Sequence, residues 1–67
     1  MDMIPVSSSR MNAIGWEANT LYIKFRDGAL YAYDNVSLSE YNAFRTSSSL
    51  GSALSQLDKI HTYHKIH

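Results

Sequence analysis

The chain has 67 residues, 45% of them hydrophobic, and six Lys and Arg residues balance six Asp and Glu residues. This length favours a single domain over 1–67, and the balanced charge argues against nonspecific nucleic-acid binding through many phosphate contacts. Cys is absent, which excludes disulfides, thiolate chemistry and Cys-ligated zinc. Neither a membrane span nor a signal-peptide pattern is visible, so we expect an unprocessed, soluble, cytoplasmic protein.

The N-terminal segment 1–10 is expected to form an extended arm along the edge of the core. Pro5 lacks a backbone N–H, which disfavours an interior strand there. Residues 11–17 alternate in polarity, and this alternation predicts a first strand that directs Trp16 to the core. A tight turn at 18–19 then pairs this strand with the next one, with Trp16 opposite Leu21 and Gly15 opposite Tyr22.

The stretch 20–36 carries the clearest local signal, because two alternating runs flank Asp27-Gly28. Asp-Gly is a strong hairpin signal, since a type I′ turn requires positive φ at both central residues. A two-residue loop at this place sets the pairing of the two strands, with Tyr22 opposite Tyr33.

This expected pairing separates two faces, because directly paired residues point to the same side of a sheet. The apolar face is a core face, made of Leu21, Ile23, Phe25, Leu30 and Ala32. The opposite face, which we call the predicted face, collects aromatic and cationic side chains around Ala29. Its candidate site residues are Tyr22, Lys24, Arg26, Tyr31 and Tyr33.

Two helices are expected after the hairpin. Ser37 and Glu40 have the spacing of a capping box, in which each side chain bonds the backbone N–H of the other, so a helix is predicted within 36–46. Apolar residues at helical spacing predict a second, amphipathic helix over 49–58. The segment 60–66 fits a short final strand or a docked tail. The predicted fold is α+β, with a three-stranded antiparallel meander and both helices on its core face.

The predicted face has three interpretations. Exposed aromatic rings stack on nucleic-acid bases and cations meet phosphates, which favours RNA or another single-stranded nucleic acid as the ligand. Tyr and Arg are also enriched at protein interfaces, which favours a protein partner or a homodimer seam. Tyrosines furthermore prefer strands and pair across them without any binding role.

Catalysis and cofactors find no support in the sequence. The serine runs 7–9 and 47–49 lack the Gly-x-Ser-x-Gly frame of a nucleophile. Three histidines follow one another at i, i+3 spacing in 61–67, but a helix would bring only two of them together. No Cys, and no carboxylate nearby in sequence except Asp58, completes a metal site. We therefore expect a non-enzymatic binding module without a catalytic site, a cofactor or a metal ion.

Several segments carry a family resemblance when taken in order. They are Ile4-Pro5-Val6-Ser7-Ser8-Ser9, Ile14-Gly15-Trp16, Leu21-Tyr22-Ile23-Lys24-Phe25, Tyr31-Ala32-Tyr33 and the closing stretch 51–66. With this order the chain resembles the KTSC domain, whose signature is a central Tyr-x-Tyr. The family is named for its occurrence at the C-terminus of some lysyl-tRNA synthetases.

The KTSC family also occurs as free-standing small bacterial and phage proteins, which this chain is similar to. RNA binding has been suggested for the family from the synthetase context, so the resemblance implies RNA as a ligand. The chain departs from the usual pattern at 53–60, where many members carry Tyr or Phe before Asn and then a basic segment. This departure weakens a binding role for that segment.

Overall fold

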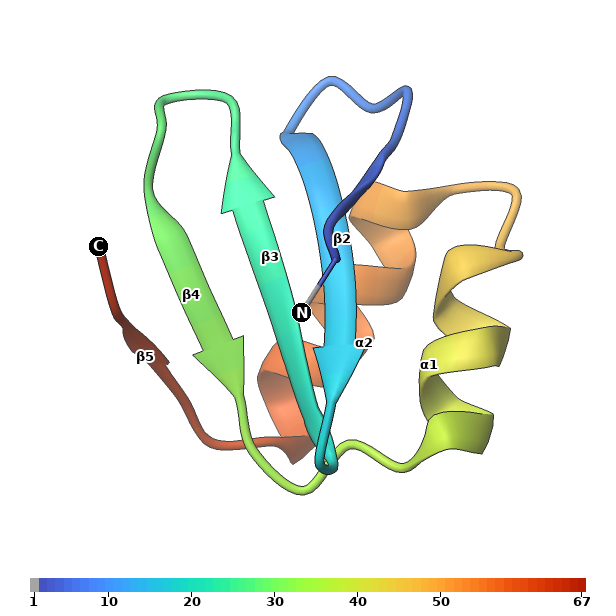
Figure 1. Ribbon diagram of the computed structural model, residues 1–67. Coiled ribbons are helices and arrows are strands. Elements are labelled where there is room, and N and C mark those ends of the chain that lie inside the picture. The colour runs from blue at the N-terminus through green and yellow to red at the C-terminus, as the bar shows by residue number, and fades with distance from the viewer. Residues whose placement is uncertain (1) are drawn as a thin grey trace.

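The computed structural model describes residues 2–67 as a five-stranded antiparallel sheet with two helices (Figure 1). The strands are β1 (Ile4–Pro5), β2 (Met11–Glu17), β3 (Thr20–Phe25), β4 (Leu30–Tyr33) and β5 (Tyr63–Lys65), and the helices are α1 (Leu38–Arg45) and α2 (Leu50–Ile60). The strands lie in the sheet in chain order. The α+β class is thus confirmed, and the expected meander, β2 to β4, gains one further strand at each edge.

The edge strands come from the two segments with the weakest sequence signals. In the arm, Ile4 pairs opposite Ile14 of β2, and Pro5 stands at the edge of the sheet as its missing N–H requires. The segment 60–66 provides β5, which pairs antiparallel with β4. In the part of the chain that the structure describes, neither helix is long and apolar enough to cross a membrane.

The turn between β2 and β3 has the expected two residues. Ala18 and Asn19 both have positive φ, at 51° and 61°, which is the backbone of a type I′ turn. Glu17 accordingly pairs with Thr20, so the predicted register of this first hairpin is confirmed.

The expected two-residue turn at Asp27-Gly28 is wrong. The Gly28 N–H donates to the Phe25 carbonyl at 3.0 Å, and the Phe25 N–H donates to the Ala29 carbonyl at 2.9 Å. Residues 26–28 therefore form a three-residue loop, in which only Gly28 has positive φ, at +94°. This is the known combination of a type I turn and a left-handed residue, and the Asp27 carboxylate supports it by accepting the Ala29 N–H.

The longer loop shifts the β3–β4 pairing by one residue. Leu21 lies opposite Tyr33, and Ile23 lies opposite Tyr31, so both tyrosines point to the helix side of the sheet. This register places two tyrosine rings, instead of a leucine and an alanine, on the helix side of the sheet, which removes more apolar surface from water. The predicted face is therefore wrong as a single surface. Its members divide between the two sides of the sheet, and Leu30 and Ala32 leave the core face for the outer side.

On the outer side of the sheet, small residues surround one aromatic ring. Tyr22 pairs with Gly15 of β2, as expected, and with Ala32 of β4. Both small residues are buried although they belong to the side without helices. Tyr22 is half-buried in consequence, and Lys24 beside it is exposed.

The core lies between the sheet and the two helices. Its buried residues come from every element from β2 to α2: Met11, Ile14, Leu21, Ile23, Tyr33, Val36, Tyr41, Phe44, Leu54 and Leu57. The capping box that opens α1 is confirmed, since Ser37 Oγ accepts the Glu40 N–H and Glu40 Oε1 accepts the Ser37 N–H, both at 3.1 Å. Both helices begin and end within two residues of the predicted bounds.

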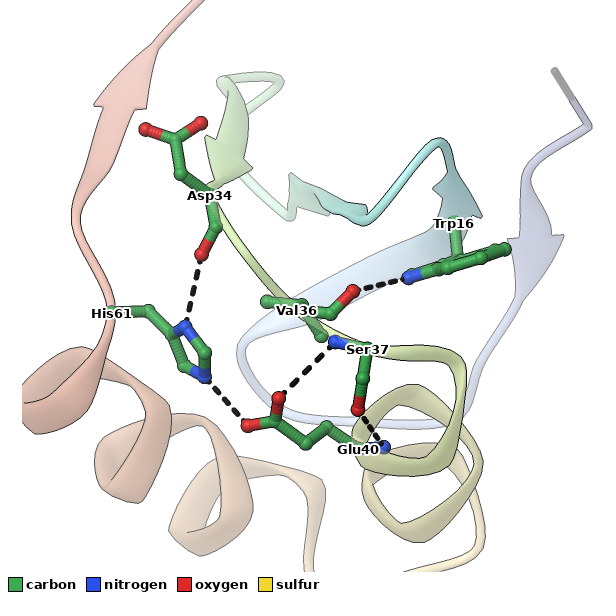
Figure 2. A network of polar contacts seen from close by, with 6 residues as sticks. All are labelled: Trp16, Asp34, Val36, Ser37, Glu40 and His61. Atoms are coloured by element: carbon green, nitrogen blue, oxygen red, sulfur yellow. Dashed lines mark hydrogen bonds and ion pairs between the residues drawn. The ribbon is translucent and has the colours of Figure 1, made fainter.

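A polar network joins the ends of the two helices (Figure 2). His61 Nδ1 lies 2.9 Å from the Asp34 carbonyl oxygen, and Nε2 lies 2.7 Å from a Glu40 carboxylate oxygen. Because both partners are acceptors, both bonds form together only when the ring carries two protons. Trp16 donates its indole N–H to the Val36 carbonyl at 2.7 Å next to this network. The network holds the chain where it leaves α2, and so it places β5 beside β4.

Candidate binding groove

The helices cover only part of the sheet. In Figure 1, α2 crosses behind β2 and β3 toward the lower end of β4, and α1 stands beside β2, whereas the β3–β4 hairpin tip and the upper parts of β4 and β5 extend past both helices. An open groove of about 460 Å³ lies there, which we call the tyrosine groove. Its lining residues are Arg10, Phe25, Arg26, Asp27, Ala29, Tyr31, Tyr33, Asp58 and Tyr63.

Four aromatic rings in contact form one side of the tyrosine groove. Phe25 and Tyr31 meet edge to face at 5.3 Å, and Tyr31 lies 6.1 Å from Tyr63. Tyr63 in turn stacks on Tyr33 at 4.9 Å. Tyr33 is buried, but Tyr63 is 45% exposed, so the row presents an accessible ring on a rigid aromatic base.

Two guanidinium groups border the groove, and both are held in place by oxygens of the chain. Arg10 Nη1 donates to the Gly51 carbonyl at 3.2 Å and lies 3.5 Å from Ser55 Oγ, so it is anchored to α2. Arg26 Nη1 donates to the Ser8 carbonyl at 2.9 Å. Each guanidinium carries five N–H donors, and most of them stay available for a ligand.

A tyrosine and a carboxylate form the polar floor of the groove. The Tyr33 hydroxyl donates to Asp58 Oδ1 at 2.7 Å. Burial, and then this hydrogen bond and the Asp58 charge, raise the pKa of Tyr33 far above its usual range, while the positive charge of Arg10 acts in the opposite direction. Tyr33 therefore stays a neutral hydrogen-bond donor and is no candidate for a catalytic base.

The structure brings together three of the five predicted site residues. Tyr31, Tyr33 and Arg26 all line the tyrosine groove. Tyr22 and Lys24 lie on the outer side of the sheet, so the five residues do not form one surface. The contact of Tyr22 with Tyr33 expected from a two-residue loop is absent from the pairing of the described strands.

Arg10, Asp58 and Tyr63 were not among the residues predicted for the site. Arg10 is far in the chain from Asp58 and Tyr63, which lie in α2 and β5, and each of the three lies next to or inside an element whose partner was not known. One signal was present. The final strand has Tyr63 and Lys65 at strand spacing, and a strand paired beside β4 places Tyr63 against the central tyrosines.

Comparison with known proteins decides the family. The sequence matches the KTSC domain over residues 7–63. The chain belongs to the KTSC domain family. A KTSC domain protein from Yersinia pestis, known from its crystal structure, is 32% identical and superposes with a TM-score of 0.89 over 98% of this chain and 97% of that one. No curated protein matches the chain.

The KTSC membership gives the groove a further meaning. The Tyr-x-Tyr through which the chain resembles the family consists here of Tyr31 and Tyr33, and both rings lie in the tyrosine groove. Their spacing of two puts them on the same side of β4. In this KTSC domain the central tyrosines therefore belong to the same surface as Arg26.

Proposed function

We propose that this KTSC domain is a small non-catalytic module that binds single-stranded RNA or DNA in the tyrosine groove. One observation carries the proposal: an exposed ring, Tyr63, continues a row of aromatic side chains in a groove that Arg10 and Arg26 also line. Proteins that bind single strands combine these same two features, aromatic platforms and cations.

The aromatic row supplies the larger share of the affinity in this account. Stacking of a base on an aromatic side chain contributes about 1–3 kcal/mol. Tyr63 is the exposed platform, and its stacking on Tyr33 keeps it from moving when a base arrives. Tyr31 offers a second, half-buried ring beside it.

The charges limit how strongly phosphates contribute. Arg10 and Arg26 share the groove with two acids, Asp27 and Asp58. Two phosphate contacts on a single strand give a salt slope of about −1.4, which lowers the affinity about sevenfold over a fourfold increase in salt. This weak dependence fits a chain of balanced charge and distinguishes the groove from a basic surface.

The test is the affinity of the intact chain for a labelled oligouridylate, measured by fluorescence anisotropy at low and moderate salt. Arg26→Ala is expected to weaken binding and to reduce the salt slope by about 0.7. Lys24→Ala removes one exposed charge from the outer side of the same hairpin and is the matched control. An effect of Lys24→Ala equal to that of Arg26→Ala would show that charge alone matters, and it would contradict binding in the groove.

Stacking is tested separately with Tyr63→Ala. Because Tyr63 is 45% exposed, its loss is expected to leave the fold intact while it weakens oligonucleotide binding by about 1–3 kcal/mol. A folded Tyr63→Ala variant that binds with unchanged affinity would refute the platform role.

Protein interaction, either with a partner or between copies of the chain, is the second candidate function. The Thr62 carbonyl and the Ile66 N–H bond toward β4 at 2.8 and 2.7 Å. In an antiparallel strand, the backbone N–H and C=O groups of successive residues point to opposite sides. Those of Tyr63 and Lys65 therefore point to the open edge of the sheet, beside the groove. A strand of another chain, added at this edge, would form hydrogen bonds with them. Oligomerisation or partner binding that is insensitive to salt, without oligonucleotide binding, would favour this function.

A further inference from the structure

The carboxylate of Asp58 is unexpected in a groove that only attracts phosphates, because both groups are negatively charged. It lies in the last turn of α2, where the helix dipole disfavours a negative charge, and it lines the tyrosine groove. Its Oδ1 accepts the Tyr33 hydroxyl, which holds the carboxylate in a defined orientation. No hydrogen bond within residues 2–67 uses the other oxygen, Oδ2, and Asp58 is only half-buried.

The two acids of the groove, Asp27 and Asp58, differ in whether the carboxylate stabilises the element to which it belongs. Asp27 Oδ1 accepts the Ala29 N–H at 3.0 Å and thereby stabilises the hairpin loop, which explains its presence. Asp58 has no comparable role in its own helix. A fixed carboxylate with a free oxygen, beside an exposed ring, is an acceptor for donors on the edge of a stacked base.

We propose that Asp58 makes the groove selective for guanine among the bases of a single strand. This inference rests on the proposed function and names the base that occupies the site. The base stacks on Tyr63, its edge donates to Asp58, and its phosphate lies toward Arg26. The two charges of opposite sign then face different parts of one nucleotide.

The selectivity follows from the hydrogen-bonding edges of the bases. Guanine presents two adjacent donors, N1–H and the 2-amino group, and a carboxylate offers two oxygens with lone pairs to spare. Adenine and cytosine place an acceptor next to their amino group, and uracil places its one donor between two acceptors. An acceptor opposite the Asp58 carboxylate is repelled and left without a partner.

The test compares oligouridylates that carry one central guanosine, inosine, adenosine or cytidine, binding to the intact chain at one salt concentration. A good bidentate pair discriminates by roughly 5- to 140-fold, so guanosine is expected to bind tighter than adenosine or cytidine by such a factor. Inosine lacks only the 2-amino group and is expected to lie between guanosine and adenosine.

Asp58→Asn keeps an oxygen for the Tyr33 hydroxyl and replaces the second acceptor with a donor. It is expected to lower the ratio of guanosine to adenosine affinity toward one. Asp34→Asn, which removes an equal charge outside the groove, is the control and should retain the ratio of the unmodified chain.

The outcomes separate the two proposals. Equal affinity for all four oligonucleotides would overturn guanine selectivity and leave single-strand binding in place. Absence of binding to every oligonucleotide would overturn both. A guanosine preference that survives Asp58→Asn would assign the selectivity to another group. The inosine series on the unmodified chain decides the inference even where the variant does not fold.

Discussion

Replacing Tyr33 by Phe removes one hydroxyl from the floor of the groove and leaves the ring in the core. The lost hydrogen bond is short, 2.7 Å, and its acceptor is the Asp58 carboxylate. A hydrogen bond to a charged group contributes about 1.5–3 kcal/mol to stability. Because Asp58 is half-exposed and water can take the place of the hydroxyl, we expect the lower end, about 1.5 kcal/mol, which is a large part of the stability of so small a domain.

The same substitution also changes how the stability of the fold depends on pH in the alkaline range. The pKa of Tyr33 is raised by burial and then by the bond to Asp58, so the folded chain keeps a proton that the unfolded chain releases above about pH 10. The stabilisation is complete below that pH and decreases as the pH rises, with a limiting slope of about 1.4 kcal/mol per pH unit. Tyr33→Phe abolishes this contribution.

Urea denaturation followed by the fluorescence of Trp16, the one tryptophan of the chain, measures both effects. Tyr22→Phe, which removes a hydroxyl without a hydrogen-bond partner in residues 2–67, is the matched control. We expect the difference between wild type and Tyr33→Phe to shrink above about pH 10. A Tyr33→Phe variant as stable as the control, with unchanged alkaline behaviour, would refute the Tyr33–Asp58 bond.

Two further predictions concern the scaffold. The hydrogen bond from the Ser37 backbone, and then that from His61, lower the pKa of Glu40 below the usual value for a glutamate. The ionised carboxylate therefore stabilises the fold at pH values above the usual pKa, and this contribution is lost as the pH falls through the lowered pKa. Glu40→Gln should reduce the urea midpoint near neutral pH and leave it unchanged in strong acid. A reduction of equal size at neutral and at acidic pH would contradict the role of the Glu40 charge. Gly28→Ala should cost about 1 kcal/mol in urea denaturation, because φ is +94° while the added methyl group meets no atom within 4 Å; a neutral result would show that the loop relaxes.

Local chemistry predicted the elements of this fold. Ser37 and Glu40 define a capping box through two residues three apart, and the structure contains both of its hydrogen bonds. The alternation of 11–17 and the amphipathic pattern of the second helix likewise depend on one segment each. Signals of this kind require no knowledge of what the segment packs against.

The register of the second hairpin could not be predicted in the same way. Asp27-Gly28 fits a two-residue loop and a three-residue loop equally well, since both need positive φ at Gly28. Packing decides between them, because one register places Tyr31 and Tyr33 on the helix side of the sheet and the other places them on the outer side. The Asp27-Gly28 signal therefore predicted the hairpin correctly, but it assigned the side chains of β4 to the wrong faces of the sheet.

The candidate site depends on that register and on contacts between distant segments. Tyr31, Tyr33 and Arg26 were found because they share one hairpin. Arg10 and Tyr63 join them only after β5 pairs with β4 and α2 crosses the sheet. A single sequence contains no measure of such long-range pairing.

An amide NMR titration of the labelled chain with a short single-stranded RNA, at low and then at high salt, tests the central claim most directly. Binding in the tyrosine groove predicts chemical-shift changes that cluster at Arg26, Tyr31 and Tyr63, with Lys24 on the outer side unaffected, and that diminish as salt is added. Changes centred on Lys24 and its outer-side neighbours, or no changes at saturating RNA, would contradict the account.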